Sequence, residues 1–160
     1  MDARANQLTG EAEQPPVQFL TFVLASQPYA VPILTVQEIR RYTPATAIPS
    51  APSYVLGVIN LRGTVVPVFD LRLRFGTGTG EVDRLTVIIV VAVGTRHVGL
   101  VVDDVSKVLT IRPGAMQSPP ELAQHIDISF IHGLVRDAEA LVTVIDVERL
   151  IGPELGNIAA

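Results

Sequence analysis

The stretch Tyr54–Arg72, Y-V-L-G-V-I-N-L-R-G-T-V-V-P-V-F-D-L-R, decides how the rest of the chain is arranged. Two runs of β-branched and apolar residues, 54–59 and 64–69, flank the link Asn60-Leu61-Arg62-Gly63. This pattern predicts a β-hairpin with a four-residue turn. Arg62 stands at its tip. Because burying an unpaired cation is costly, Arg62 must face solvent or another molecule.

The chain contains this hairpin twice. Phe130–Gly152 aligns with Tyr54–Gly76 without a gap, 76 residues further along, and matching glycines, valines and an aspartate coincide. Upstream, Val98–Val108 aligns with Tyr29–Ile39 at a spacing of 69 residues. Each half therefore has about five short strands and a terminal helical turn, a pattern typical of small β-barrels or sandwiches.

The predicted fold class is all-β, with two five-stranded barrels formed by residues of about 17–76 and 84–152. One barrel of this size alone would be marginal, so the two are expected to share a hydrophobic core. Residues 1–16 are expected to be a disordered tail, and Gly76–Asp83 a flexible Gly-rich linker within a domain that spans 17–155. The short helices are expected at Asp70–Phe75 and Asp146–Ile151, the second ending before Gly152-Pro153.

Composition excludes several classes of protein. The 160 residues carry a net charge of −4 and no long basic run, which argues against a nucleic-acid partner. There is no cysteine, so neither disulfides nor thiol chemistry are expected. The longest apolar run, Val87–Val93, is far shorter than the ~20 residues that span a bilayer. The sequence thus predicts a cytoplasmic protein that does not insert into membranes.

Catalytic and metal-binding patterns are weak. His97, His125 and His132 do not stand at ligand spacing with one another or with an acidic residue. Asp103 and Asp104 are neighbours on a strand end and point to opposite faces, so we expect solvated carboxylates there. The glycine-rich linker lacks the Lys-Ser/Thr pair of a phosphate loop. We therefore expect no enzyme, no metal and no cofactor.

The repeat separates residues that build the fold from residues free for another purpose. Positions that are alike in both halves, such as Val36 and Gly57, are explained by what both barrels need. Arg62 corresponds to Ala138, however, and Glu38 corresponds to Lys107. This comparison predicts that Glu38 and Arg62 are not required by the scaffold.

The motifs V-Q-E-I-R, G-V-I-N-L-R-G, P-V-F-D-L-R and V-G-L-V-V-D-D-V together resemble the CheW family of chemotaxis coupling proteins. The resemblance covers Val17 to about Leu155, and it implies two SH3-like barrels around a common core. It further implies a cytoplasmic adaptor that joins the regulatory domain of the histidine kinase CheA to the cytoplasmic tips of methyl-accepting chemotaxis receptors in membrane-associated arrays. In the family the receptor tip lies between the barrels, and the kinase contacts come chiefly from the first.

The resemblance also implies a set of receptor- or kinase-binding residues. They are Val36, Glu38, Ile39, Gly57, Asn60, Arg62, Gly99, Ser106 and Val108. Three alternatives stay open at this point: a related scaffold of a non-flagellar chemosensory pathway, a ligand-binding β-barrel and a nucleic-acid-binding barrel. Uniformly aliphatic inward positions disfavour the second, and an aromatic content of only 5% disfavours the third.

Overall fold

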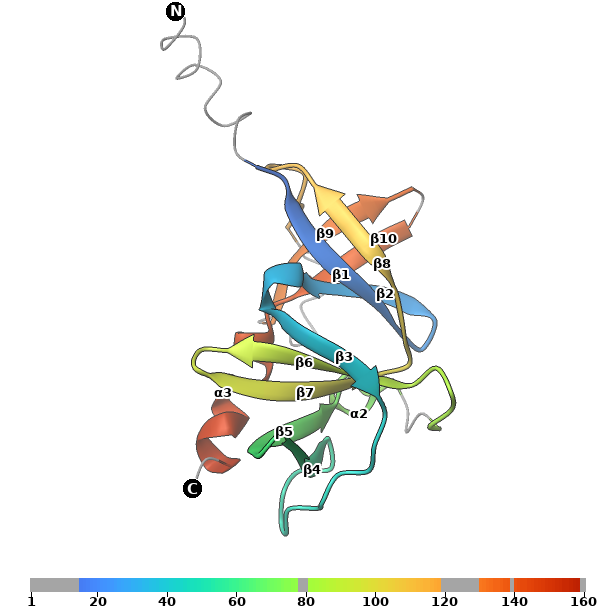
Figure 1. The fold of residues 1–160 in the computed structure, drawn as a ribbon. Helices are drawn as coiled ribbons and strands as arrows, with labels where there is room; N and C mark the ends of the chain where they lie inside the picture. Colours follow the sequence, from blue (N-terminus) through green and yellow to red (C-terminus); the bar gives the residue numbers. More distant parts are fainter. Residues whose placement is uncertain (1–14, 78–80, 119–129, 139, 159–160) are drawn as a thin grey trace, which may run out of the picture.

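The computed structural model describes residues 15–77, 81–118, 130–138 and 140–158, and two five-stranded β-sheets dominate it (Figure 1). Most of the expected tail, the centre of the linker and much of the second long loop lie outside the described residues. Two short helices, α2 and α3, follow the two hairpins of the repeat. The predicted all-β fold class is confirmed.

Each sheet is named here by its strands in spatial order. Sheet A consists of β8 (Asp104–Ile111), β1 (Val17–Leu24), β2 (Gln27–Pro32), β10 (Ala140–Ile145) and β9 (Ile131–Asp137). Sheet B consists of β3 (Val36–Arg41), β6 (Val87–Val93), β7 (Arg96–Val102), β5 (Thr64–Asp70) and β4 (Val55–Leu61). Neighbouring strands are antiparallel except for the pairs β2–β10 and β5–β7, which are parallel.

The two halves of the sequence exchange strands, so the expectation that 17–76 and 84–152 each form their own barrel is wrong. Sheet A joins β1 and β2 to three strands of the second half, and sheet B joins β6 and β7 to three strands of the first half. The connections explain the exchange. Only Asp103 separates β7 from β8, which is too short for the hairpin turn that would return β8 onto β7. The chain therefore continues into the other sheet.

Both sheets close at the same point of the repeat. The segment after β3 pairs with β4 through Thr46 and Val58, and the segment after β8 pairs with β9 through Gln117 and Leu134. At the closure of sheet B, the backbone of β4 lies directly against the backbone at Thr46. A Cβ on Gly57, whose φ is +139°, would lie 1.9 Å from the carbonyl oxygen of Thr46. Glycine is therefore required at this position by the closure of the barrel.

A shared hydrophobic core joins the two sheets, as predicted. Phe22 and Ile145 of sheet A and Phe69 and Leu100 of sheet B belong to one buried cluster. Phe75, just after α2, stacks on Tyr29 at 5.4 Å and on Phe130 at 4.9 Å between ring centroids. Neither sheet can therefore be removed without exposing the core of the other.

The first hairpin has a two-residue turn instead of the predicted four-residue turn. Strand β4 extends to Leu61 and β5 begins at Thr64, which leaves Arg62 and Gly63 as the turn. Their φ angles are +51° and +88°, as in a type I′ turn, whose twist matches that of the flanking strands. Ala138 has a φ of +57° in the second hairpin, so the positive φ of Arg62 belongs to the turn in both halves.

The helices follow the two hairpins, each begun by an aspartate as predicted. Helix α2 (Leu71–Arg74) is capped by Asp70, and the Asp146 carboxylate accepts from the N–H of Arg149 in the first turn of α3 (Val147–Ile158). The second helix does not end before Gly152-Pro153 as expected. Leu150 and Ile151 hold its first turns in the core, and the proline removes one hydrogen bond without ending the helix.

Candidate protein-binding site

Glu38 and Arg62 form an ion pair across the closure of sheet B. Glu38 lies on the edge strand β3, Arg62 lies in the turn after the other edge strand β4, and the guanidinium donates a hydrogen bond to the Glu38 carboxylate. This hydrogen bond lowers the pKa of Glu38 below its ordinary value. The Arg62 side chain remains 77% exposed, so the pair lies where another protein could reach it.

Sheet A carries the matching ion pair with the charges reversed. Lys107, the counterpart of Glu38, lies 2.8 Å from the carboxylate of Asp137, the neighbour of Ala138. The side chains of Lys107 and Asp137 are 56% and 27% exposed, against 77% and 26% for Arg62 and Glu38. An ion pair at the closure is thus common to both barrels. The two pairs differ in polarity, and Glu38 has a second cation nearby, since Nη1 of Arg40 lies 3.6 Å from its carboxylate. A difference between the halves is therefore not enough to separate Glu38 and Arg62 from the structure of the barrel.

Polar groups surround the Glu38–Arg62 pair. Asn60 is exposed on β4, and its side-chain oxygen accepts a hydrogen bond from the N–H of Gly63 in the turn, which supports the turn that carries Arg62. The pair borders a cleft of about 340 Å³. Gln37, Leu61, Thr64, Val66, Val90 and His97 complete its lining. The cleft, the turn and the pair form one polar surface on sheet B.

A second group of predicted residues lies on the edge strands β3 and β8. Ile39 and Val108 are counterparts in the repeat, and 43% and 47% of their surfaces are exposed. Ser106 is exposed on β8. Val36, on β3, is half-buried and packs against the shared core. Exposed aliphatic residues on edge strands suit contact with another protein.

Gly57 and Gly99 are buried, so any part they play in binding is indirect. A Cβ on Gly99 would lie 2.8 Å from the Ile88 side chain and 3.4 Å from the Val68 side chain. Gly57 is required where β4 meets Thr46. Both glycines permit close packing inside sheet B, and the surface formed by the exposed residues depends on that packing.

Sequence reasoning missed a buried ion cluster at the far end of β5. Arg72, only 3% exposed, makes two hydrogen bonds of 3.0 Å to the Asp70 carboxylate and one of 3.2 Å to Asp103. Asp103 also accepts from the N–H of Ala25, so it is not the solvated carboxylate expected from the sequence. The available signal was the D-L-R motif, which places a cation two residues after a helix cap.

The described residues hold no group of three or more His, Cys, Asp or Glu side chains that could bind a metal ion. His97 and His132 are exposed on β7 and β9, and His125 lies outside the described residues. No helix in the described part of the chain is long and apolar enough to cross a membrane.

Two closed β-sheets around one core, with a charged surface at the edge of one of them, define a small all-β domain with a candidate protein-binding surface. The model of the CheW-like domain family matches residues 18–154. The chain therefore belongs to the CheW-like family.

Relatives and a solved structure agree with this assignment. The chemotaxis protein CheW of Klebsiella aerogenes is 39% identical over 137 residues, which cover 86% of this chain and 82% of that protein. The chemotaxis protein CheW of Rhizobium meliloti is also 39% identical, over 86% of this chain and 88% of its own length. The crystal structure of the scaffolding protein TtCheW from Thermoanaerobacter tengcongensis is similar with a TM-score of 0.79 and 32% identity, covering 85% of this chain and 88% of that one.

Proposed function

We propose that this chain is a non-enzymatic adaptor that couples the cytoplasmic tips of methyl-accepting chemotaxis receptors to the regulatory domain of the histidine kinase CheA. The match of the CheW-like family model to residues 18–154 carries the proposal. The adaptor works in the cytoplasm and is recruited to membrane-associated receptor arrays. Its relatives are chemotaxis proteins, and the similar solved structure is that of a scaffolding protein.

The polar surface on sheet B is proposed as a contact for a partner. Exposed charges at the rim of an interface determine which partner fits, and they do so more than they add to affinity. Arg62 is 77% exposed, and Glu38 orients its guanidinium. A partner with a carboxylate could bind the guanidinium donors that Glu38 leaves unused, because arginine has five N–H donors.

The edge strands β3 and β8 are proposed as the apolar part of the interaction surface. Ile39 and Val108 present aliphatic side chains to solvent, and Ser106 adds a small polar group. A helical receptor tip binds through apolar side chains repeated along one face, so a surface with exposed aliphatic residues suits it. Val36, Gly57 and Gly99 support this surface from within.

Calorimetric titration against the two partners separately, and then together, tests the proposal. The protein should bind a purified CheA regulatory domain and a receptor cytoplasmic fragment, and all three should form one complex. A receptor fragment that lacks its hairpin tip is the matched control and should not bind. Binding to one partner alone, or to neither, would contradict a coupling function.

A further inference from the structure

The chain crosses between the two sheets at two points that are equivalent in the repeat. It passes from sheet A to sheet B through the 3-10 helix η1 (Ile33–Thr35) and returns through Asp103, between β7 and β8. The spacing of 69 residues that relates β2 and β3 to β7 and β8 makes Leu34 the counterpart of Asp103. The two crossings nevertheless differ in what fills the space beside them.

Arg72 fills the space beside the second crossing. Its guanidinium binds both oxygens of Asp70, reaches Asp103 at 3.2 Å and donates to the carbonyl oxygen of Glu81 at 3.3 Å. The chain's own arginine thus joins the end of β5 to the crossing and to the linker. Only 3% of the Arg72 side chain is exposed to solvent.

The space beside the first crossing is an open cleft of about 380 Å³. The repeat relates Asp70 to Asp146 and Arg72 to Glu148, so the second half has the carboxylate but lacks the arginine. Leu34, which stands where Asp103 stands at the other crossing, is 90% exposed. The lining comprises Pro32, Thr35, Ala92, Val93, Gly94, His132, Ile145, Asp146, Val147 and Glu148.

We propose that this cleft binds an arginine side chain of a partner polypeptide, with Asp146 in the part that Asp70 plays for Arg72. The described residues that line the cleft include two carboxylates, Asp146 and Glu148, and no lysine or arginine. Its remaining walls are mainly apolar and suit the methylene groups of the arginine and its neighbours. The proposal does not depend on the coupling function above.

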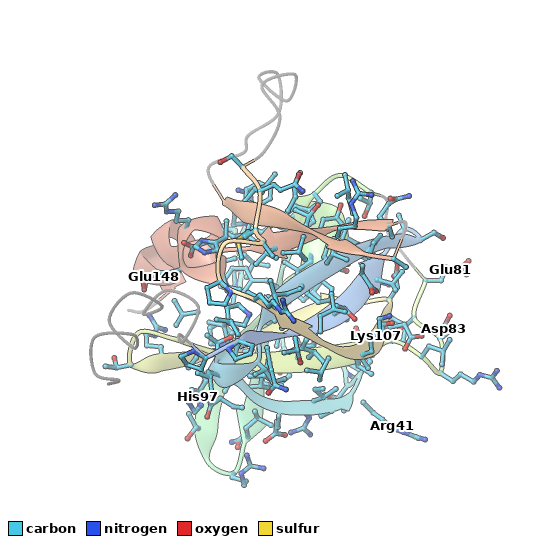
Figure 2. The ribbon with its side chains drawn as sticks, turned by 90° about the horizontal axis from the view of Figure 1, so that it is seen from above. Arg41, Glu81, Asp83, His97, Lys107 and Glu148 are labelled. Carbon is cyan, nitrogen blue, oxygen red and sulfur yellow. The ribbon has the colours of Figure 1, made fainter. Side chains whose placement is uncertain are left out.

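The present partner of Asp146 leaves room for such a ligand. The Nε of Arg149 lies 3.5 Å from Asp146 and its side chain is 69% exposed, whereas the contacts of Arg72 with Asp70 are 3.0 Å long and buried. A planar guanidinium that enters the cleft can bind the Asp146 carboxylate with two parallel hydrogen bonds. The contact of 3.5 Å between Nε of Arg149 and Asp146 is too long for such a pair of bonds. Figure 2 shows Glu148 at the α3 side of the molecule, away from Glu81.

Amide chemical shifts of the full-length protein, titrated with a short peptide, test the proposal. The probe is acetyl-Leu-Arg-Leu-amide, and its twin carries citrulline, which keeps the shape of arginine without the charge. The arginine peptide should give saturable shifts confined to the amides of Thr35, Gly94 and Val147 and their neighbours. The citrulline peptide should bind at least about tenfold more weakly, because it loses the charge-assisted bonds.

Glu148→Arg is the decisive variant, because it rebuilds in the second half the Asp-x-Arg arrangement of Asp70 and Arg72. Its own arginine should occupy the cleft and abolish peptide binding. Glu81→Arg makes the same change of charge elsewhere and should bind like the parent protein. Asp146→Asn keeps a capping side chain at the start of α3 and should also lose binding, which covers the case in which Glu148→Arg fails to fold.

Three results would overturn the proposal: equal binding of the arginine and citrulline peptides, parent-like binding by Glu148→Arg or Asp146→Asn, and shifts outside the cleft. Light scattering on the parent protein adds a further check. A dimer that Glu148→Arg dissociates would identify a second copy of this chain as the occupant, and this result too would contradict the proposed partner.

Discussion

Arg62 and Glu38 come from opposite edges of sheet B and join in one ion pair where the barrel closes. At the equivalent closure of sheet A, Lys107 and Asp137 form a pair of reversed polarity. The fold therefore uses an ion pair at both closures and tolerates either arrangement of the charges. The arrangement in sheet B is thus available for recognition of a partner.

Arg72→Ala should destabilise the protein by about 3–5 kcal/mol, because it leaves the buried Asp70 carboxylate without its partner. Arg149→Ala is the matched control, since Arg149 contacts the equivalent Asp146 from a side chain that is 69% exposed. It should change stability by less than about 1 kcal/mol. Urea denaturation of both variants measures the two effects, and equal losses would contradict the structural role of Arg72.

Gly57→Ala should prevent stable folding or lower the melting temperature strongly. The added Cβ would lie 1.9 Å from the Thr46 carbonyl oxygen, and the φ of +139° is unfavourable for any other residue. Gly63→Ala is a fair comparison, because Gly63 also has a positive φ but has no atom within 4 Å of the added Cβ. Thermal melts should rank Gly57→Ala far below Gly63→Ala; similar melting temperatures would refute the close approach.

Acid should remove the stability that Glu38 contributes. The hydrogen bond from Arg62 holds the pKa of Glu38 below its ordinary value, so the folded state binds the proton more weakly than the unfolded state. Such a carboxylate stabilises the protein above the unfolded pKa of about 4.3, and its contribution is lost as the pH falls through the lower folded pKa. The melting temperatures of Glu38→Gln and the parent should differ at neutral pH and converge as the pH falls below the lowered folded pKa of Glu38. A difference that persists in acid would assign the effect to packing.

Neither half of the chain should fold alone, because each sheet needs strands from both halves. Residues 1–84 and 85–160, expressed separately, should give the NMR spectra of unfolded chains, and an equimolar mixture should recover the dispersed spectrum of the intact protein. A folded spectrum from 85–160 alone would contradict the shared core.

The sequence predicted the elements of this fold better than their partners. The hairpins, the aspartate caps and the shared core follow from local patterns and from the repeat. The repeat indicates that β1 corresponds to β6. It does not indicate whether each of these strands pairs with strands of its own half or of the other half. The observed pairing follows from the one-residue connection at Asp103, which the sequence analysis placed at the end of a strand and not at a crossing between two sheets.

Differences between the halves proved an incomplete guide to the candidate site. Arg72 differs from its counterpart Glu148, and yet it is buried and structural. Lys107 differs in charge from Glu38, and yet each forms an ion pair at the closure of its own sheet. A residue can therefore differ from its counterpart in the other half and still have a structural role. Exposure and pairing, which only the structure provides, separate these cases.

The central claim is that the polarity of the Glu38–Arg62 pair serves recognition of a partner, while an ion pair of either polarity can stand at the closure of the barrel. The double variant Glu38→Arg/Arg62→Glu tests it directly, because it keeps an ion pair and gives it the polarity found between Lys107 and Asp137. Lys107→Glu/Asp137→Lys is the matched control. Affinities for the CheA regulatory domain and the receptor fragment are measured for both, together with melting temperatures. The account predicts that both variants melt like the parent, and that only Glu38→Arg/Arg62→Glu loses about tenfold or more in affinity for at least one partner. Parent-like binding of both partners by Glu38→Arg/Arg62→Glu would contradict it.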